Sequence, residues 1–380
     1  MFQPNHASKV VGTSDLSCQL PRQSSLRNPS SAQSSQSADS AAQSQNTHQP
    51  TPFDRPHSSQ NLAPTVAQDA IEHPFFLVGA ERSGSTMLRL MLNQHPQLSW
   101  GVESDFIVSQ MSDEGTLPAL EDYYAWLEVN RIFQLCQFQV DRDLTYAELV
   151  KSFLSQQRDR TQKPLIGATV HHHFNRLRFL WPNARYIHLL RDARDVARSC
   201  VGMGWAGNVW RGVERWIEAE NLWANLRPQI PADRRLEVTY EALIQDPIAQ
   251  LTRICDFIGI PYDDAMLQYP TSTTYSFPDP QHISQWRQKL SPWEIQLIES
   301  RTASMLVERG YPLSNLSTPN PQPWQPFLTL EDWLMRRSFR LRRYGFGLLA
   351  SDWLARNLGL ESWQKHLQIQ LNQVDNLHLK

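Results

Sequence analysis

The stretch FFLVGAERSGSTMLRLMLNQHP, residues 75–96, decides the fold that the sequence predicts. It begins with a short apolar run that suits a buried strand of a parallel sheet, and it continues into a helical pattern that Pro96 ends. In the loop between them, Gly79 and Gly84 have the G-x-x-x-x-G spacing of a phosphate-binding loop. The lysine that usually follows the second glycine is missing, because Ser85 stands in its place. The loop therefore raises the question of which nucleotide, if any, it binds.

The loop has the features of an anion site. In a strand-loop-helix unit the first helical N–H groups are unpaired, and the helix dipole adds partial positive charge at the same end. Glycine lets backbone amides come close to a phosphate, and Arg82 inside the loop can supply the positive charge of the missing lysine from another direction. The alternative is a Gly/Ser turn that binds no ligand.

The folded part is predicted to be one α/β domain, residues 73–316. The run ARYIHLL (residues 184–190) predicts a second strand, and RLEVTYEAL (residues 235–243) predicts a third strand and a turn. A helical pattern follows each of them. Strands separated by helices predict a P-loop-type three-layer fold, with a central parallel sheet flanked by helices.

The two ends of the chain differ from this domain. Residues 1–72 are rich in Ser, Gln, Asn, Ala and Pro and have few large apolar groups, so they are predicted to be a disordered low-complexity tail. The Pro-rich residues 317–326 predict a linker to a helical C-terminal extension, residues 327–380. Thr329 and Asp332 fit a capping signal near the start of that extension.

The extension combines aromatic residues and leucines with arginines at positions 336, 337, 340, 342 and 343. One interpretation is a helix packed on the core with a solvated basic face. The other is an interfacial helix in peripheral contact with a membrane, or a docking surface for an acidic partner.

The composition narrows the function classes. The formal net charge is -2, so there is no global basic field and no nucleic-acid partner is predicted. The four cysteines, Cys18, Cys136, Cys200 and Cys255, lack C-x-x-C spacing and predict free thiols in a reducing compartment. No apolar run approaches the roughly 20 residues of a membrane-spanning helix, and the N-terminus lacks the apolar core of a secretory signal. A cytoplasmic protein is therefore expected.

A second motif, YIHLLRDARDVARS, suggests a second anion site. Arg191 stands at the carboxyl end of the strand at residues 184–190, where ligands of open α/β sheets bind, and Ser199 lies in the following helix. A guanidinium and a hydroxyl suit a phosphate monoester. The alternative is that Arg191 pairs with Asp192 or Asp195 and only ends the strand.

Four segments, in this order, resemble the sulfotransferase superfamily, which uses 3'-phosphoadenosine-5'-phosphosulfate (PAPS). GAERSGSTMLRLMLNQHPQLSWGVES (residues 79–104) resembles the family's 5'-phosphosulfate loop, most closely in the tyrosylprotein-type and bacterial branches, and WPNARYIHLLRDARDVARS (181–199) resembles its 3'-phosphate motif. VTYEALIQDPIAQLTRICDFIGIPYDDAML (238–267) and ISQWRQKLSPWEIQLIESRTASMLVERGYPL (283–313) resemble its downstream segments. The resemblance spans residues 74–313.

The resemblance implies two sets of nucleotide-binding residues. The 5'-phosphosulfate would be held by Arg82, Ser83, Gly84, Ser85 and Thr86, and the 3'-phosphate by Arg191 and Ser199. A nucleotide with a 5'-phosphosulfate and a 3'-phosphate explains why two anion sites exist, which a triphosphate leaves unexplained.

Three kinds of side chain are candidates for the proton transfer. Glu103 lies where related enzymes carry a catalytic glutamate, and Asp105 is the close alternative. A solvated loop carboxylate is the non-catalytic interpretation of Glu103. Many relatives also carry a leaving-group lysine where this chain reads IGATVHHHFNRL, so one histidine, such as His171, can serve there as a base or as a charge near the sulfonate. Adjacent histidines point in different directions, so no metal site is predicted.

The segment CVGMGWAGNVWRGVERWIEAENLW follows the second motif. Its glycines, Gly202, Gly204 and Gly207, suggest a flexible loop over the site. Trp205 and Trp210 lie in irregular sequence and are candidates to line an acceptor cleft. Trp216 and Trp223, seven residues apart in a helical pattern, are predicted to be core residues.

The function expected from the sequence is transfer of a sulfonate group from PAPS to a hydroxyl acceptor, with PAP as product and Arg82, Glu103 and His171 as catalytic residues. No metal is expected to be required. The acceptor is a glycan, a lipid, a small molecule or a peptide. The alternatives are a P-loop kinase or NTPase, which the missing lysine disfavours, and a non-catalytic scaffold of the same fold.

Overall fold

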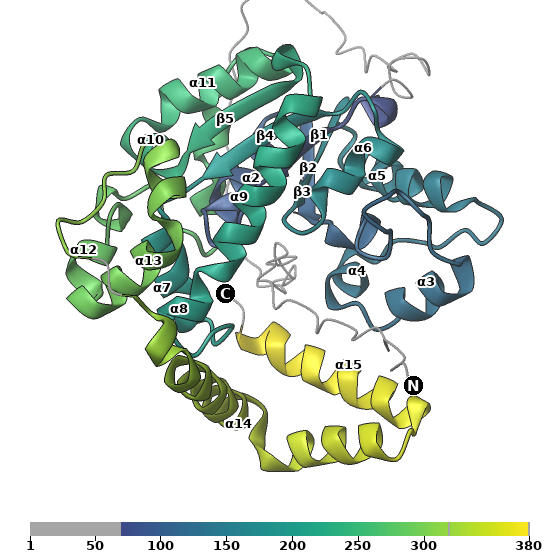
Figure 1. The fold of residues 1–380 in the computed structure, drawn as a ribbon. Helices are drawn as coiled ribbons and strands as arrows, with labels where there is room; N and C mark the ends of the chain where they lie inside the picture. The colour runs from purple at the N-terminus through teal and green to yellow at the C-terminus, as the bar shows by residue number, and fades with distance from the viewer. Residues whose placement is uncertain (1–69, 318–319, 379–380) are drawn as a thin grey trace, which may run out of the picture.

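The computed structural model describes residues 70–317 and 320–378, and its centre is a parallel five-stranded sheet (Figure 1). The strands are β1 (Phe75–Val78), β2 (Leu98–Glu103), β3 (Leu165–Val170), β4 (Arg185–Leu190) and β5 (Arg235–Thr239), in the spatial order β2-β3-β1-β4-β5. All four neighbouring pairs are parallel. This order puts β1, and the glycine loop that follows it, in the middle of the sheet.

Helices cover both faces of this sheet, so the predicted three-layer α/β fold is confirmed. Their bounds within the domain are α2 (Ser85–Gln94), α3 (Leu120–Leu127), α4 (Arg131–Cys136), α5 (Tyr146–Thr161), α6 (Leu177–Leu180), α7 (Ala193–Gly202), α8 (Val209–Gly212), α9 (Glu214–Leu226), α10 (Tyr240–Gln245), α11 (Pro247–Ile258), α12 (Trp286–Lys289) and α13 (Pro292–Glu308).

Alternate residues of β1 enter two different apolar clusters, as the period of a strand requires. Phe75 and Leu77 pack with α2, α10 and α11, whereas Phe76 and Val78 pack with α5, α7 and α9. A strand that is buried on both faces reads as a continuous apolar run, which is why FFLV is recognisable in the sequence.

Two strands of the sheet, β2 and β3, are not evident in the sequence. Each contains a glycine, and neither is a continuous apolar run. Gly167 of β3 is needed because a Cβ there would lie 2.2 Å from the ring of Trp100 on β2. The cross-strand fit of an indole against a glycine is a tertiary requirement that neither segment reveals by itself.

The domain starts earlier than the predicted boundary after residue 72. Residues 70–72 are helical, Ala70 and Ile71 are buried in the core, and the Trp181 indole N–H donates to the Ile71 carbonyl at 2.8 Å. The predicted disorder of residues 1–69 lies outside the described residues. So does Cys18, whereas Cys136, Cys200 and Cys255 are buried and form no disulfide with one another.

The C-terminal extension is helical, as predicted. It consists of α14 (Gln325–Asn357), which is kinked at Gly345 (φ 76°), and α15 (Glu361–His378). The capping prediction at Thr329 is wrong, because α14 begins before it and Thr329 is an exposed interior residue. Within the described residues, no helix is long and apolar enough to cross a membrane.

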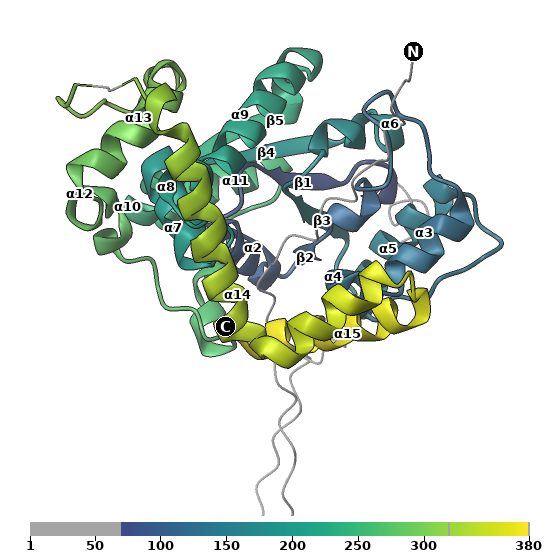
Figure 2. The ribbon, with the colours of Figure 1, turned by 60° about the horizontal axis from the view of Figure 1, so that its bottom comes forward.

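Residues 325–378, which we call the C-terminal strap, connect two sides of the domain (Figures 1 and 2). The strap begins against α8, where Leu328 packs with Trp210. At its other end, α15 returns to the α3–α4 junction, where the Asn372 side chain donates to the Val129 carbonyl at 3.0 Å. The strap therefore passes across the end of the domain between α8 and α4.

Candidate active site at the carboxyl ends of the strands

The predicted site residues meet at one edge of the sheet. Each follows the carboxyl end of a strand: the glycine loop follows β1, Glu103 ends β2, His171 follows β3 and Arg191 follows β4. Because the four strands are neighbours in a parallel sheet, residues that are distant in sequence share one edge. This is the edge at which ligands bind in open α/β sheets.

The loop between β1 and α2 has the shape of an anion site. Gly84 has φ 93°, and a Cβ there would lie 2.4 Å from the ring of Tyr240, so only glycine fits. No side chain caps α2 at Gly84, which leaves the N–H groups of Ser85 and Thr86 available to a ligand. The hydroxyl of Ser83 is buried and has no hydrogen-bond partner in the part of the chain that the structure describes.

The two predicted anion-binding groups contact each other directly. Arg82 Nε donates to Ser199 Oγ at 3.0 Å, and Arg191 Nη1 donates to the Arg82 carbonyl at 3.1 Å. The Arg191 guanidinium also lies over the Tyr240 ring, 4.0 Å from its centroid. Its Nε is buried and has no hydrogen-bond acceptor among residues 70–317 and 320–378.

The alternative role of Arg191, as a partner of neighbouring aspartates, is weakly supported. Its Nη2 is 4.0 Å from Asp195 Oδ2, the upper limit of an ion pair. Asp192 is instead paired with Arg194 at 2.7 Å, and Asp195 accepts the backbone N–H of Trp286 at 2.8 Å. Arg191 therefore keeps donor capacity for a ligand.

Glu103 and His171 form a buried pair beside the loop. His171 Nδ1 donates to the Gly79 carbonyl at 2.8 Å, and its Nε2 lies 3.1 Å from Ser85 Oγ and 3.5 Å from Glu103 Oε1. Glu103 is 5% exposed, so the interpretation of it as a solvated carboxylate is wrong. Its Oε2 is buried and has no hydrogen-bond partner within the described ranges.

The environment of His171 favours its charged form. Burial lowers the pKa of His171, but the hydrogen bond and charge of Glu103, with the charges of Asp105 and Glu81, outweigh burial and raise the pKa to about 9. At neutral pH the imidazole is therefore protonated. A protonated imidazole can stabilise negative charge on a bound ligand, and it cannot accept a proton.

Asp105 has a different position from Glu103. Its Oδ1 accepts the backbone N–H groups of both His171 and His172, at 2.8 and 2.7 Å, so it fixes the backbone after β3. His172 turns toward Glu81, with Nε2 3.3 Å from Oε2, and Arg215 pairs with the same carboxylate. His171 and His172 thus diverge, as predicted. No cluster of three metal-ligating side chains occurs in the described chain.

His171 should make stability depend on pH. A histidine whose pKa rises from 6.5 to about 9 on folding stabilises the fold fully below the lower value and loses this contribution as pH rises through the higher one. We compare the free energy of unfolding of the wild type with that of His171→Gln. The difference between them should shrink by roughly 3 kcal/mol between about pH 6 and about pH 10. Urea unfolding at several pH values measures it, and a difference independent of pH would contradict the protonated state.

A cavity of about 1000 Å³ opens beside these groups. Glu103, Asp105 and all three histidines line it, together with Trp126, Arg131, Trp205, Arg215 and Arg336. Its volume is that of a large ligand site. It lies between the loop and the strap, so it is the space in which a second reactant could approach the loop.

The tryptophan predictions are partly correct. Trp205 lines the cavity and lies beside Arg82 and Arg215, with guanidinium-to-centroid distances of 5.6 and 4.5 Å. Trp216 and Trp223 are fully buried core residues, as predicted. Trp210 does not line the cavity, because Leu328 of the strap and Leu297 of α13 cover it.

The strap contributes to the cavity and holds the loop that carries Trp205. Arg336 lines the cavity, and Asp332 Oδ1 accepts the backbone N–H of Gly207 at 2.7 Å. A Cβ at Gly204 would lie 2.3 Å from the ring of Phe339. Two of the three glycines predicted to give a flexible loop, Gly204 and Gly207, are thus positions at which α14 packs closely against the backbone, whereas a Cβ at Gly202 would meet nothing within 4 Å.

Removing the Asp332 carboxylate should loosen this loop. In Asp332→Ala the Gly207 N–H loses its acceptor, at a cost of about 1–3 kcal/mol, and we expect amide exchange in residues 203–208 to accelerate about tenfold or more. Hydrogen–deuterium exchange measures this effect. The matched variant Asp332→Asn keeps a side-chain oxygen and should retain most of the protection. Equal exchange in all three proteins would show that the hydrogen bond does not restrain the loop.

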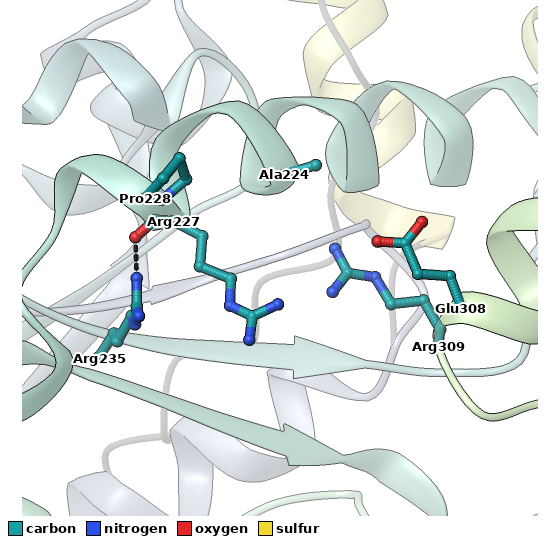
Figure 3. Close-up of a pocket in the computed structure, with 6 residues that line it drawn as sticks. All are labelled: Ala224, Arg227, Pro228, Arg235, Glu308 and Arg309. Atoms are coloured by element: carbon teal, nitrogen blue, oxygen red, sulfur yellow. Dashed lines mark hydrogen bonds between the residues drawn. The ribbon is translucent and has the colours of Figure 1, made fainter.

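A second hollow, of about 330 Å³, does not have the features of a nucleotide site (Figure 3). Two of its three arginines are paired with glutamates: Arg227 Nε is 3.1 Å from Glu237 Oε1, and Arg309 Nε is 2.7 Å from Glu220 Oε2. Arg235, which also lines it, is the first residue of β5, at the end of the strand opposite to the glycine loop.

The residues present at the glycine loop fit a nucleotide that carries two separate anionic groups. The loop amides, the Ser83 hydroxyl and Arg82 could hold one anion, and the Arg191 Nε and Ser199 could hold a second one beside it. Bound anions would supply acceptors to the two buried donors, Ser83 Oγ and Arg191 Nε.

The comparison with known proteins agrees with this geometry. Residues 74–264, about half of the chain, match the family model described as "Sulfotransferase family". The chain belongs to the sulfotransferase family. The predicted resemblance is thereby confirmed, and the matched region contains the glycine loop, Glu103, His171, Arg191 and Ser199.

Individual relatives are distant. The chain is 26% identical to protein-tyrosine sulfotransferase A of Caenorhabditis elegans over 208 residues, which cover 52% of each protein. It is 24% identical to the protein-tyrosine sulfotransferase of Drosophila melanogaster over 203 residues, 51% of this chain and 39% of that protein. The chain thus spans about half or less of the length of these relatives.

Two solved structures show the same fold. They are the sulfotransferase domains from the Synechococcus PCC 7002 olefin synthase and from the curacin biosynthetic pathway, each with a TM-score of 0.50. Their identities are 23% and 20%, and the similarity covers 64% of this chain and 97% and 99% of theirs. Both alignments leave about a third of this chain unmatched.

Proposed function

We propose that this protein transfers a sulfonate group from PAPS to a hydroxyl acceptor and leaves PAP as product. The observation that carries the proposal is the direct contact between the two anion-binding groups, Arg82 Nε to Ser199 Oγ at 3.0 Å and Arg191 Nη1 to the Arg82 carbonyl at 3.1 Å. Two adjacent anion positions suit a nucleotide with a 5'-phosphosulfate and a 3'-phosphate. A triphosphate would leave the second position unused.

Different residues of the chain would perform different parts of such a transfer. PAPS, when bound, supplies a transferable sulfonate on a phosphate that can leave. The Arg82 guanidinium, the amides of Ser85 and Thr86 and the protonated His171 supply positive potential where negative charge grows. No metal is needed in this scheme, because these groups supply the positive charge. Glu103 is the base, since it lines the cavity in which the acceptor would be held and its Oε2 has no hydrogen-bond partner among the described residues.

The acceptor is a hydroxyl compound that enters the cavity beside Glu103. The protein-tyrosine sulfotransferases among the relatives make a tyrosyl peptide the first acceptor to test. A glycan, a lipid and a small alcohol also offer a hydroxyl group as the nucleophile, so they belong in the same panel of acceptors. We place the protein in the cytoplasm, which agrees with the buried cysteines Cys136, Cys200 and Cys255, none of which forms a disulfide with another. We also expect peripheral contact with a membrane.

Two measurements test the proposal. Thermal stabilisation by PAP without Mg²⁺ is the expected result, and stabilisation by Mg²⁺-ATP alone would favour a kinase or NTPase instead. Incubation with labelled PAPS and a panel of acceptors should then give a labelled product. Binding of PAP with no transfer to any acceptor in the panel or in a cell extract would favour the non-catalytic scaffold.

Arg191 should select nucleotides that carry a 3'-phosphate. We expect Arg191→Ala to raise the Kd for PAP by about 10- to 100-fold, because a charge-assisted bidentate contact is lost. The Kd for adenosine 5'-phosphate, which lacks the 3'-phosphate, should change by less than about threefold. Isothermal titration calorimetry measures both. Equal weakening of both nucleotides would show that Arg191 acts only by holding the loop through the Arg82 carbonyl.

A further inference from the structure

The first part of α14, before the kink at Gly345, has an apolar side that faces away from the protein. Leu330, Leu334 and Leu341 recur there at helical spacing, with Phe327 and Trp333 beside them. The exposed fractions of these five side chains are 54%, 50%, 48%, 67% and 47%, in the order named. A contiguous exposed row of large apolar side chains marks an interaction surface.

The opposite side of the same helix is held by the rest of the protein. Leu328 packs with Trp210, and Asp332 accepts the Gly207 N–H. Arg343 is buried against Asp375 of α15, with Nε 3.0 Å from Oδ1. These contacts fix the rotation of α14 about its axis, so its apolar side is presented to the outside by the fold itself.

Positive charge accompanies the apolar side. Five arginines and only two carboxylates lie between Phe327 and Tyr344. Arg337, Arg340 and Arg342 are exposed and form no ion pair with any residue of the described chain. Arg337 lies in line with the leucines, and its guanidinium is 4.2 Å from the centroid of the Trp333 ring.

The same character continues after the kink. Phe346 is 78% exposed and Trp353 is 66% exposed, and Leu354 and Leu358 are exposed beyond them. Figures 1 and 2 both show α14 at the periphery of the molecule, where its outer side is not covered by another labelled element. The outer face of α14 is therefore a long surface of aromatic and leucine side chains bordered by arginines.

We propose that the outer face of α14 docks on the surface of an anionic phospholipid bilayer. Tryptophan, phenylalanine and leucine side chains enter the boundary between headgroups and acyl chains, and unpaired arginines bind the phosphate headgroups. A second copy of this chain is a poorer occupant, because a two-fold interface pairs this face with itself. The arginines would then be buried against a face whose two carboxylates, Glu331 and Asp332, already accept hydrogen bonds from Asn208 and Gly207. An acidic protein would form ion pairs with the arginines, but it would leave the row of apolar side chains exposed to water.

Vesicle flotation with the full-length protein tests this proposal. Vesicles of phosphatidylcholine that contain about a third phosphatidylglycerol should float about tenfold more protein than vesicles of phosphatidylcholine alone, and higher salt should reduce the difference. Leu334→Gln and Arg337→Glu should each lower binding severalfold. The matched controls are Ile248→Gln and Arg253→Glu on α11, which change exposed residues of the same kind outside the strap and should bind like the wild type.

Three results would overturn the proposal. The first is equal flotation with both kinds of vesicle. The second is wild-type binding by the two α14 variants, with circular dichroism showing that all the variants are folded. The third is a wild-type dimer in sedimentation velocity that Leu334→Gln dissociates, since this would assign the surface to a second copy of the chain.

Discussion

Glu103→Gln is expected to lower kcat by about 10²- to 10⁴-fold, the range that a positioned general base contributes. The substitution keeps the size of the side chain and removes both its ability to accept a proton and its negative charge beside His171. Glu103 has the required position, because it lines the cavity and its buried Oε2 is free of hydrogen bonds from the described residues. The Kd for PAP should change by less than about threefold, since Glu103 is not assigned to the nucleotide.

Two substitutions of His171 distinguish a residue that accepts a proton from one that only supplies positive charge. Single-turnover rates with labelled PAPS should fall in His171→Gln and be partly restored in His171→Lys, because lysine returns the positive charge. If Glu103→Gln keeps full turnover while His171→Gln and His171→Lys both lose it, then His171 is the base. That result would also contradict the raised pKa of His171.

Arg194→Met is expected to lower the free energy of unfolding by about 3–5 kcal/mol, because it leaves two buried carboxylates without their ion-pair partner. Arg194 is fully buried, with guanidinium nitrogens 2.7 Å from Asp192 Oδ2 and 2.7 Å from Glu299 Oε1. It also lies over Trp286, 3.6 Å from the ring centroid. For a domain of this size, Tm should fall by roughly 6 to 20 °C.

The control for Arg194 is an exposed ion pair. Arg142 lies 3.6 Å from Glu121, and the two side chains are 62% and 82% exposed, so Arg142→Met should cost less than about 1 kcal/mol. Differential scanning calorimetry compares the two variants. An Arg194→Met protein as stable as Arg142→Met would mean that water or neighbouring groups compensate the buried carboxylates.

The sequence was sufficient for those parts of the site that depend on local chemistry. A buried strand, two glycines and a helix predict an anion loop, and an arginine at the end of a second buried strand predicts another anion position. The structure brings Arg82, Arg191 and Ser199 into contact as that reasoning requires. The base could not be settled from sequence, because burial of Glu103 and the charge state of His171 depend on β2 and β3, whose pairing is tertiary.

The contribution of the strap could not be predicted, for the same reason. Asp332 was interpreted as part of a helix cap because only its neighbours in the sequence were known, whereas its partner, the Gly207 N–H, is on another element. Trp210 was expected at the acceptor cavity because nothing in its own segment showed that Leu328 covers it. Contacts between distant segments of the chain override both local patterns.

The position of Arg336 in the cavity has a consequence for how such a protein can diversify. The family match ends at residue 264, whereas Arg336 and the residues that restrain the Trp205 loop come after it in one contiguous stretch. A single recombination event after Leu313 would replace Arg336 and the contacts that hold the Trp205 loop, and would leave Glu103, His171 and the glycine loop intact. This part of the cavity lining can therefore change as one C-terminal unit, independently of the residues at the sheet edge.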